Sequence, residues 1–358
     1  MPRIPRSCLV CAFPARTGLG RTAENLFRLG FFEEMAFLKF DRRDPDVGYP
    51  RVIRSRWDAL GGAGAFASQY FPSAWRQALR SYDFVHFQSP HFFHLAPGVR
   101  QATGTVHDTL FFDPRHRHGY PLGARLYFRN EFKHANQLRG LATDSAQTQR
   151  EVHSVAPTAP STVIHLWTDD RFKIRDRNSA REQLGLPEEP TLLLHVGTDE
   201  PRKNLEVLPG ILNELGENFL LVRIGRSDRI ISQFRHRNLR VLDSVSEEDY
   251  PLYFNAADMV LQPSREEGFG YPIIEAINSG TPVIASNIPV FRELLGADYP
   301  FCLSPDAPID WVRAVRTVAE TLRTPGAISD LYRPFGSYYR EARGAKDFEM
   351  FFRQAGVL

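Results

Sequence analysis

The 358-residue chain is poor in cysteine and lacks a long apolar run, and each absence excludes a class of protein. Three cysteines are too few for a disulfide framework. No segment approaches the roughly 20 apolar residues that a membrane-spanning helix needs. The N-terminal stretch holds Pro2, Pro5 and only a short apolar run, which suits neither a signal peptide nor a spanning helix. The expected location is therefore the cytoplasm.

The chain also lacks a strong charge of either sign, an internal repeat and any low-complexity tract. It has 44 Lys and Arg against 42 Asp and Glu, a formal net charge of +2. This balance argues neither for nor against nucleic acid as a partner. The length suffices for two domains, each with its own hydrophobic core.

Cys8 and Cys11 have the C-x-x-C spacing that can hold zinc or do redox chemistry, so both functions must be weighed. They lie in an apolar segment that predicts the first strand, where residues three apart point to opposite faces. No second cysteine pair exists, because only Cys302 remains. The sequence therefore predicts buried thiols, and no metal site is expected.

Short apolar runs alternate with helical stretches along the chain. This alternation predicts an α/β protein with parallel sheets and helices on both faces. Residues 42–66 show no clear period and predict a long loop or a weak helix. The charged segment through Pro190 predicts an interdomain linker. The expected strands are 7–13, 35–40, 84–87, 103–106, 140–143, 162–164, 191–197, 219–225, 240–245, 258–263 and 282–286; the expected helices are 18–29, 124–135, 147–155, 247–257, 271–279, 309–322 and 336–358.

The segment 258–293 has the most informative pattern. An apolar strand ends at Pro263, a glycine-bearing loop follows, and a helix runs from Tyr271 to the glycine at 280. Such a loop presents backbone N–H groups at a helix N-terminus, which is a favourable place for a phosphate. Glu267 and Glu275 flank it, with seven residues between them.

Two other strand ends carry candidate site residues. Arg202 and Lys203 follow a strand that ends in glycine, which suits a diphosphate, although they could also form a solvated helix entry. His107 follows another strand, where ligands bind in open α/β sheets, and a bond to its own loop is the alternative. For His86 a structural role is expected.

Gly18 and Gly20 open a helix directly after the first strand. Their backbone can approach a phosphate or an acceptor, or they can simply form a tight turn. A full dinucleotide fingerprint needs a third glycine at position 23. Ala23 is an accepted variant there, so this motif alone does not exclude NAD.

Segment 115–139 gathers cations with aromatic residues between them. It could bind an anionic acceptor, either a lipid phosphate at a membrane surface or a nucleic acid. The alternative is a solvated helix face. The cations are Arg115, Arg117, Arg125, Arg129, Lys133 and Arg139.

The string E-GFGYPII-E followed by SGTPVIAS, with Glu293 downstream, resembles the signature of retaining glycosyltransferases of the GT-B architecture, glycosyltransferase family 4 in particular. The strings GTDEPRKN and TVHDTLFFDP are also similar to segments of that family. The resemblance implies two Rossmann-like domains facing across a cleft. Residues 1–170 would bind the acceptor and 171–335 the nucleotide sugar, and a helix in 336–358 would cross back to the first domain.

The resemblance also implies roles for individual residues. Glu267 would lie by the donor sugar, and Glu275 would hold the ribose. Lys203, with Arg202 beside it, would clamp the diphosphate. His107 would contact the sugar or the acceptor. The backbone of Gly268, Phe269 and Gly270 would touch sugar and diphosphate, and Gly18 and Gly20 would form the glycine-rich first loop.

The implied reaction is a metal-independent transfer of a hexose, with retained configuration, from a GDP-mannose or UDP-glucose type donor. The acceptor would be a hydroxyl of a glycan, a lipid-linked glycan or another biomolecule, and no cofactor is expected besides the donor. Peripheral contact with the inner membrane face, or with nucleic acid, would run through 115–139.

Two positions depart from the family pattern. Thr198 stands where many members carry arginine, and Trp167 stands where the family has glycine. These departures keep open a catalytically silent module that binds sugar or nucleic acid. A sugar-nucleotide epimerase on the same fold, which would turn over donor without acceptor, is the other alternative.

Overall fold

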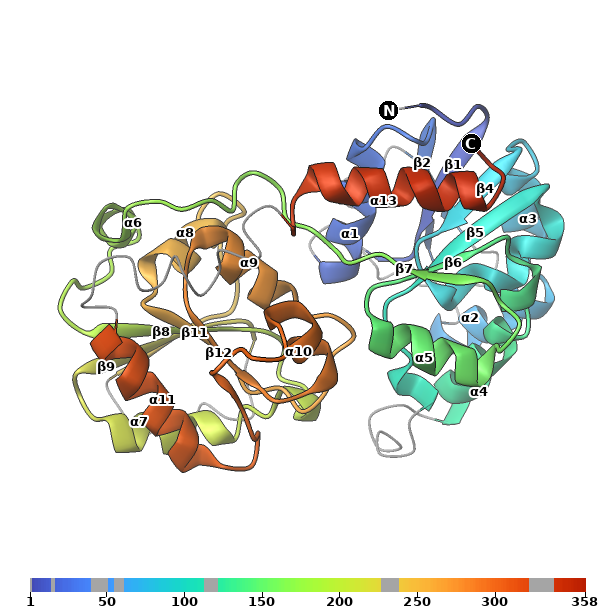
Figure 1. Cartoon of the computed structure of the whole chain (residues 1–358). Coiled ribbons are helices and arrows are strands. Elements are labelled where there is room, and N and C mark those ends of the chain that lie inside the picture. The colour runs from blue at the N-terminus through green and yellow to red at the C-terminus, as the bar shows by residue number, and fades with distance from the viewer. Residues whose placement is uncertain are drawn as a thin grey trace. The chain divides into compact units, whose positions relative to one another are not determined.

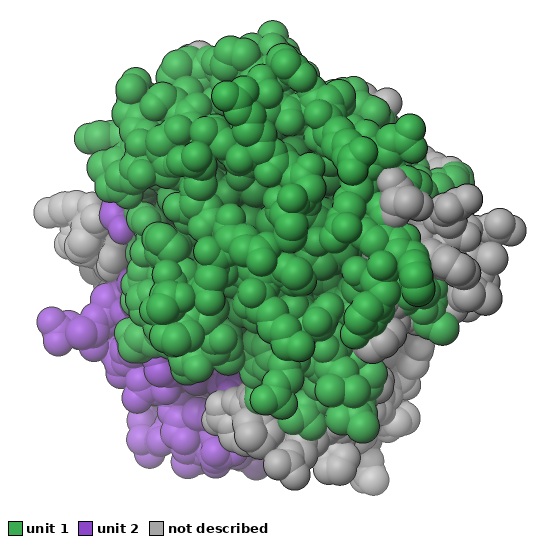
Figure 2. Space-filling model, turned by 90° about the vertical axis from the view of Figure 1, so that its right-hand side faces the viewer, with its two compact units in different colours: residues 1–166, 342–358 green, residues 167–341 purple. Residues whose placement is uncertain are grey.

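The computed structural model describes residues 2–13, 17–39, 51–54, 61–112, 122–226, 238–321 and 338–358. The chain divides into two compact units (Figures 1 and 2). Unit 1 comprises Met1–Leu166 and Ala342–Leu358, and unit 2 comprises Trp167–Glu341. In the described part of the chain, no helix has both the length and the apolar character to cross a membrane.

Unit 1 is built on a seven-stranded parallel sheet in the order β3-β2-β1-β4-β5-β6-β7. The central strands are buried on both faces, which explains why their sequences are continuous apolar runs rather than alternating patterns. The strands are β1 Ser7–Cys11, β2 Glu34–Lys39, β3 Arg51–Arg54, β4 Phe84–Phe87, β5 Gln101–Val106, β6 Leu141–Thr143 and β7 Ser161–Val163.

The C-terminal helix α13 packs on unit 1 although it follows unit 2 in the chain (Figure 1). Its buried face carries Phe348, Phe351 and Phe352, a helical spacing of three and four. Phe352 makes edge contacts with Phe31 and Phe84. The other helices of the unit are α1 Gly18–Arg28, α2 Gly61–Tyr70, α3 Ser73–Leu79, α4 Leu122–Phe132 and α5 Ala146–Val155, with 3-10 turns at η2 Pro90–Gly98, η3 Leu110–Phe112 and η5 Ala135–Gln137; α13 spans Glu341–Gln354.

Unit 2 is a second parallel α/β unit with a six-stranded sheet in the order β10-β9-β8-β11-β12-β13. Its strands are β8 Thr191–Val196, β9 Phe219–Ile224, β10 Leu239–Leu242, β11 Met259–Gln262, β12 Val283–Ser286 and β13 Cys302–Leu303. Its helices are α6 Arg177–Gln183, α7 Val207–Leu215, α8 Tyr250–Ala256, α9 Tyr271–Ser279, α10 Pro289–Leu295 and α11 Pro308–Thr321, with the 3-10 turn η6 Pro201–Lys203. The α/β prediction with Rossmann-like parallel sheets is confirmed.

Local sequence explains the helix ends near the site. Pro272 stands in the first turn of α9, where its missing N–H costs nothing. Gly280 ends the helix in the left-handed conformation, with φ +73°, which glycine adopts without strain. In unit 1, Ser145 caps α5 as its side chain accepts a hydrogen bond from the Thr148 amide.

Two local expectations are wrong. Within 42–66, the residues Arg51–Arg54 form the edge strand β3 and α2 starts at Gly61; the strand is short and only half buried, so it lacks an apolar signature. The segment before Pro190 is not a simple linker, because it contains α6. The buried guanidinium of Arg181 donates to the carbonyl oxygens of Pro187 and Glu188 and pairs with Asp258, which fixes this segment to unit 2.

Each sheet has a switch point, where the strand order reverses direction. In unit 1 it lies between β1 and β4, and in unit 2 between β8 and β11. Loops that follow these strands diverge, and this divergence is where open parallel sheets bind ligands. Every candidate site residue predicted above follows β1, β5, β8 or β11.

Candidate active site

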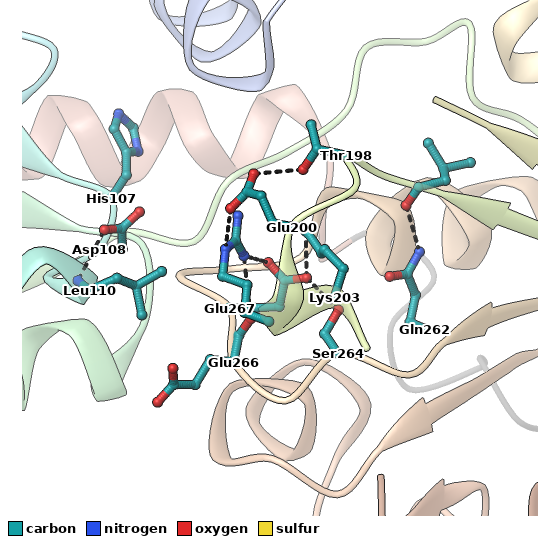
Figure 3. A network of polar contacts seen from close by, with 12 residues as sticks. His107, Asp108, Leu110, Thr198, Glu200, Lys203, Gln262, Ser264, Glu266 and Glu267 are labelled. Atoms are coloured by element: carbon teal, nitrogen blue, oxygen red, sulfur yellow. Dashed lines mark hydrogen bonds and ion pairs between the residues drawn. The ribbon is translucent and has the colours of Figure 1, made fainter. Parts of the chain in front are cut away.

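The carboxylate of Glu267 is the centre of a compact ionic network in unit 2 (Figure 3). Lys203 Nζ lies 2.6 Å from its Oε1, and Arg202 Nη1 lies 2.8 Å from its Oε2. Ser264 Oγ also donates to Oε1, at 2.7 Å. The two cations come from η6 after β8, while Glu267 and Ser264 follow the neighbouring strand β11. Residues 64 positions apart thus meet at the switch point.

Electrostatics keep this network charged. Glu267 is only 8% exposed, and burial by itself raises the pKa of its carboxyl. The opposite charges of Lys203 and Arg202, together with hydrogen bonds from Lys203 and Ser264, outweigh burial and lower that pKa from 4.5 to about 2. The result is a buried carboxylate with two cations whose side chains stay partly accessible.

A second layer of contacts orients Arg202. Its Nε lies 2.7 Å from Glu200 Oε2, and Thr198 Oγ1 donates to the other oxygen of Glu200 at 2.6 Å. The loops are also joined through their backbones, since the Arg265 amide donates to the Arg202 carbonyl at 2.7 Å. Thr198 therefore supplies a hydrogen bond where the family pattern has a cation.

The glycine loop leads from Glu267 into α9. Gly270 has φ +111°, and a Cβ there would come within 2.7 Å of Phe291, so this turn requires glycine. The Phe269 side chain is 5% exposed and packs near Tyr271 and Tyr339. Its ring therefore anchors the loop, and only the backbone of this residue can serve a ligand.

Glu275 lies in α9, apart from the ionic network. Its side chain is fully buried, and Tyr250 Oη donates to its Oε2 at 2.8 Å. The Tyr250 hydroxyl therefore occupies one of the acceptor sites of this carboxylate. The ribose role of Glu275 stays a prediction.

In unit 1 the structure places His107 at the end of β5, buried and bonded on both ring nitrogens. Nδ1 lies 2.6 Å from Asp144 Oδ2, and Nε2 lies 2.8 Å from the Gln88 carbonyl oxygen. Burial opposes a charge on the ring, but the charge of Asp144 and these hydrogen bonds raise the pKa of His107 above its usual 6.5. Both ring nitrogens thus face acceptor oxygens of groups that follow β6 and β4.

The glycines after β1 lie in the first turn of α1. Thr17 caps this helix, and its hydroxyl accepts the Gly20 amide at 3.0 Å, so that amide is already used. Gly18 and Gly20 are both absent from the positive-φ residues, so no left-handed turn requires them. His86 lies in the sheet interior between Thr103 and Thr105, and burial lowers its pKa to about 3, as a structural role predicts.

The structure thus brings Lys203 and Arg202 into direct contact with Glu267. Gly268–Gly270 follow Glu267 in the chain, and Glu275 lies beyond the first turn of α9. Sequence reasoning missed three partners in these sites. They are Ser264, Glu200 and Asp144, and all three are polar residues in loops that follow a buried strand. That position is the signal that could have found them.

The remaining candidates for site chemistry are clusters of metal-ligating side chains and the three cysteines. Among the residues that the structure describes, no group of three or more His, Cys, Asp or Glu side chains is arranged to hold a metal ion. Cys8, Cys11 and Cys302 are buried cysteines outside any disulfide. Burial raises the pKa of Cys8 to about 12, which makes it a poor nucleophile.

Comparison with known proteins places these features in context. Residues 176–325 match the family model "Glycosyl transferases group 1". The chain is 28% identical over 249 residues to the O-antigen chain mannosyltransferase RfbU of Salmonella typhimurium, covering 66% of this chain and 65% of that protein. It is 26% identical over 250 residues to the O-antigen chain mannosyltransferase B of Escherichia coli, covering 62% of each. These matches span just under two thirds of the two relatives.

Solved structures resemble the fold over nearly the whole chain. The Anabaena protein Alr3699/HepE, in complex with UDP and glucose, superposes with a TM-score of 0.78 at 16% identity, covering 97% of this chain and 99% of that one. Sucrose-phosphate synthase from Thermosynechococcus elongatus superposes with a TM-score of 0.79 at 18% identity, covering 98% and 99%.

Proposed function

Because the chain belongs to the glycosyl transferases group 1 and has the GT-B fold, we propose that it transfers a hexose from a nucleotide-diphosphate sugar to a hydroxyl of a glycan. We further propose GDP-mannose as the donor, since two relatives are named as mannosyltransferases, and an O-antigen type polysaccharide as the acceptor. The observation that carries the proposal is the contact of Glu267 with Lys203 and Arg202 at the switch point of unit 2.

The two cations would stabilise the leaving diphosphate. In this structure they neutralise Glu267, and the donor would draw them partly onto its phosphate oxygens. The backbone amides of Gly268–Gly270, at the start of α9, would add fixed dipoles. Because protein cations supply the charge, no divalent metal is required, and EDTA should leave activity unchanged.

Glu267 would orient the donor sugar and stabilise positive charge that develops at its ring. Its low pKa keeps it ionised throughout the neutral range, which suits electrostatic stabilisation and does not suit proton donation. We propose retention of configuration with departure and attack on one face. Proton NMR of the anomeric signal in the product tests this, and an inverted product contradicts it.

His107, Gly18 and Gly20 would belong to the acceptor side in unit 1. In the described conformation both nitrogens of His107 are bonded within the protein, so contact with a substrate requires Nε2 to leave the Gln88 carbonyl oxygen. The proposal also keeps the protein in the cytoplasm, with any membrane contact peripheral.

A thermal-shift panel with GDP, UDP, ADP and their sugars tests the donor site. A ligand at 100 times its dissociation constant stabilises the folded state by about 2.7 kcal/mol, enough for a shift of a few degrees. A shift with GDP alone supports the proposal, and a shift with UDP alone replaces the donor. Lys203→Ala should abolish the shift, and the exposed Lys346→Ala serves as the control. Turnover of donor into an epimer without acceptor would favour the epimerase, and no shift with any nucleotide would favour the silent module.

A further inference from the structure

Helix α4 carries a solvent-facing stripe that neither the fold nor the donor site uses. Its members recur at helical spacing: Leu122, Arg125, Leu126 and Arg129 lie in the helix, and Lys133 follows its last residue. Leu122 is 68% exposed and Leu126 is 49% exposed, among the most exposed large apolar side chains of the described residues. The aromatic residues of the helix, Tyr127, Phe128 and Phe132, are buried in unit 1.

The stripe borders a cavity of about 590 Å³ between α4 and the end of α5. Phe112, Phe132 and Val155 contribute apolar surface, and the three cations of the stripe contribute charge. None of the lining residues is acidic. Glu131, the only acid in the sequence of α4, is buried on the other face and bonded to His94.

The cations of the stripe have no counter-ion in the described part of the chain. No ion pair or side-chain hydrogen bond joins Arg125, Arg129 or Lys133 to another described residue, and the Nε of Arg125 is buried without a partner. Arg115 and Arg117, which the sequence groups with them, lie outside the described residues. Three cations without a counter-ion among the described residues, beside exposed leucines, complement a partner that offers both negative charge and an apolar interior.

This surface is separate from the candidate active site. Ser154 and Val155, which line the cavity, end α5, whereas Ser145 caps its start beside Asp144. The ten residues of α5 span about 15 Å. The cavity thus lies toward the end of the helix opposite to His107 and its partners.

We propose that the leucine–cation stripe of α4 docks unit 1 on an anionic lipid surface. The cations would contact phosphates of the headgroups, while the two leucines enter the boundary with the acyl chains and the cavity receives part of a lipid. A basic patch and apolar insertion together give the two signals that stable peripheral binding needs. Single-stranded nucleic acid fits less well, because it is held by aromatic stacking and the aromatic residues of α4 face inward.

Vesicle flotation of the whole purified chain tests this proposal without donor or acceptor. Its result is therefore independent of whether the protein transfers a glycosyl group. Vesicles of phosphatidylcholine alone are compared with vesicles that also contain phosphatidylglycerol. We expect binding only to the anionic vesicles, weakened by added salt. The active-site variant Lys203→Ala should float like the wild type.

Two sets of variants assign the binding to the stripe. The triple variant Arg125→Gln, Arg129→Gln, Lys133→Gln should weaken partitioning about 100-fold, because each cation near an anionic surface contributes about fivefold. The pair Leu122→Ser, Leu126→Ser should weaken it by about tenfold. The matched control changes three exposed arginines elsewhere in the chain, Arg28→Gln, Arg80→Gln, Arg313→Gln, and should bind like the wild type.

Several outcomes would overturn the proposal. They are no binding to anionic vesicles, equal binding by the triple variant and its control, or full binding by the leucine pair. Binding of an RNA oligonucleotide that is lost in the triple variant, without vesicle binding, would assign the stripe to nucleic acid instead. Circular dichroism melts of all variants establish that each is folded.

Discussion

The two sheets of this protein place polar residues at equivalent edges but leave them in different states. In unit 2, Lys203 and Arg202 share one carboxylate and remain partly accessible, with side chains 12% and 18% exposed. In unit 1, His107 is 6% exposed, and its two ring nitrogens are hydrogen-bonded to Asp144 and to the Gln88 carbonyl oxygen. Cations that stay partly accessible can meet an anionic ligand, whereas an internally bonded pair is expected mainly to stabilise the fold.

Removing His107 tests this difference most severely. His107→Ala leaves the buried carboxylate of Asp144 without its partner, so the free energy of unfolding should fall by about 3–5 kcal/mol. Urea unfolding measures this loss, and the exposed His153→Ala provides the control. Unchanged stability together with a large loss of turnover would show that His107 acts mainly on the substrate and not on the stability of the fold.

The two pairs should also respond to pH in opposite directions. The folded pKa of Glu267 is depressed to about 2, so its contribution of about 3 kcal/mol is present above pH 4.5 and is lost as the pH falls toward 2. The folded pKa of His107 is raised, so its contribution is present below about pH 6.5 and is lost as the pH rises through the folded value.

Melting curves across pH separate these contributions. Glu267→Gln should flatten the acid side of the profile, and Asp144→Asn should flatten the alkaline side. Glu248→Gln removes an exposed carboxylate and should leave the profile as in the wild type. An acid loss that survives in Glu267→Gln would show that other carboxylates control acid unfolding.

Lys203→Ala tests the ligand side of the comparison. Loss of one charged contact to a developing anion costs about 100-fold in turnover, or about 2.7 kcal/mol, so we expect a decrease of that size with a smaller change in stability. Steady-state assays with GDP-mannose measure it, and Lys346→Ala is the control. Turnover near that of the wild type would exclude Lys203 as a diphosphate contact.

The sequence was sufficient for the architecture but not for the contacts. The buried strands β8 and β11 are apolar runs bounded by turn residues, so their positions follow from pattern alone. Resemblance assigned Lys203 and Glu267 to one donor site, but their direct contact was not predicted, because it joins loops 64 residues apart and depends on strand order. The edge strand β3 and the bond between His107 and Asp144 were missed, since a half-buried strand has little apolar signal and a side-chain pairing has none.

Substitution of Thr198, which stands where many family members carry arginine, should have the smallest effect on turnover among these predictions. Thr198 holds Glu200, and Glu200 in turn holds the Nε of Arg202, so the hydroxyl acts on the diphosphate site only through two intermediate contacts. A hydrogen bond to a solvent-exposed carboxylate contributes about 0.5–1 kcal/mol, and Thr198→Val should therefore lower turnover about threefold and leave the effect of Lys203→Ala unchanged in size. Thr198→Ser keeps the hydroxyl and should restore activity. A 100-fold loss in Thr198→Val that Thr198→Ser restores would mean that Arg202 contributes to turnover only when Glu200 orients it. The donor-site cations of unit 2 would then depend on hydrogen bonds within the protein as much as His107 does in unit 1.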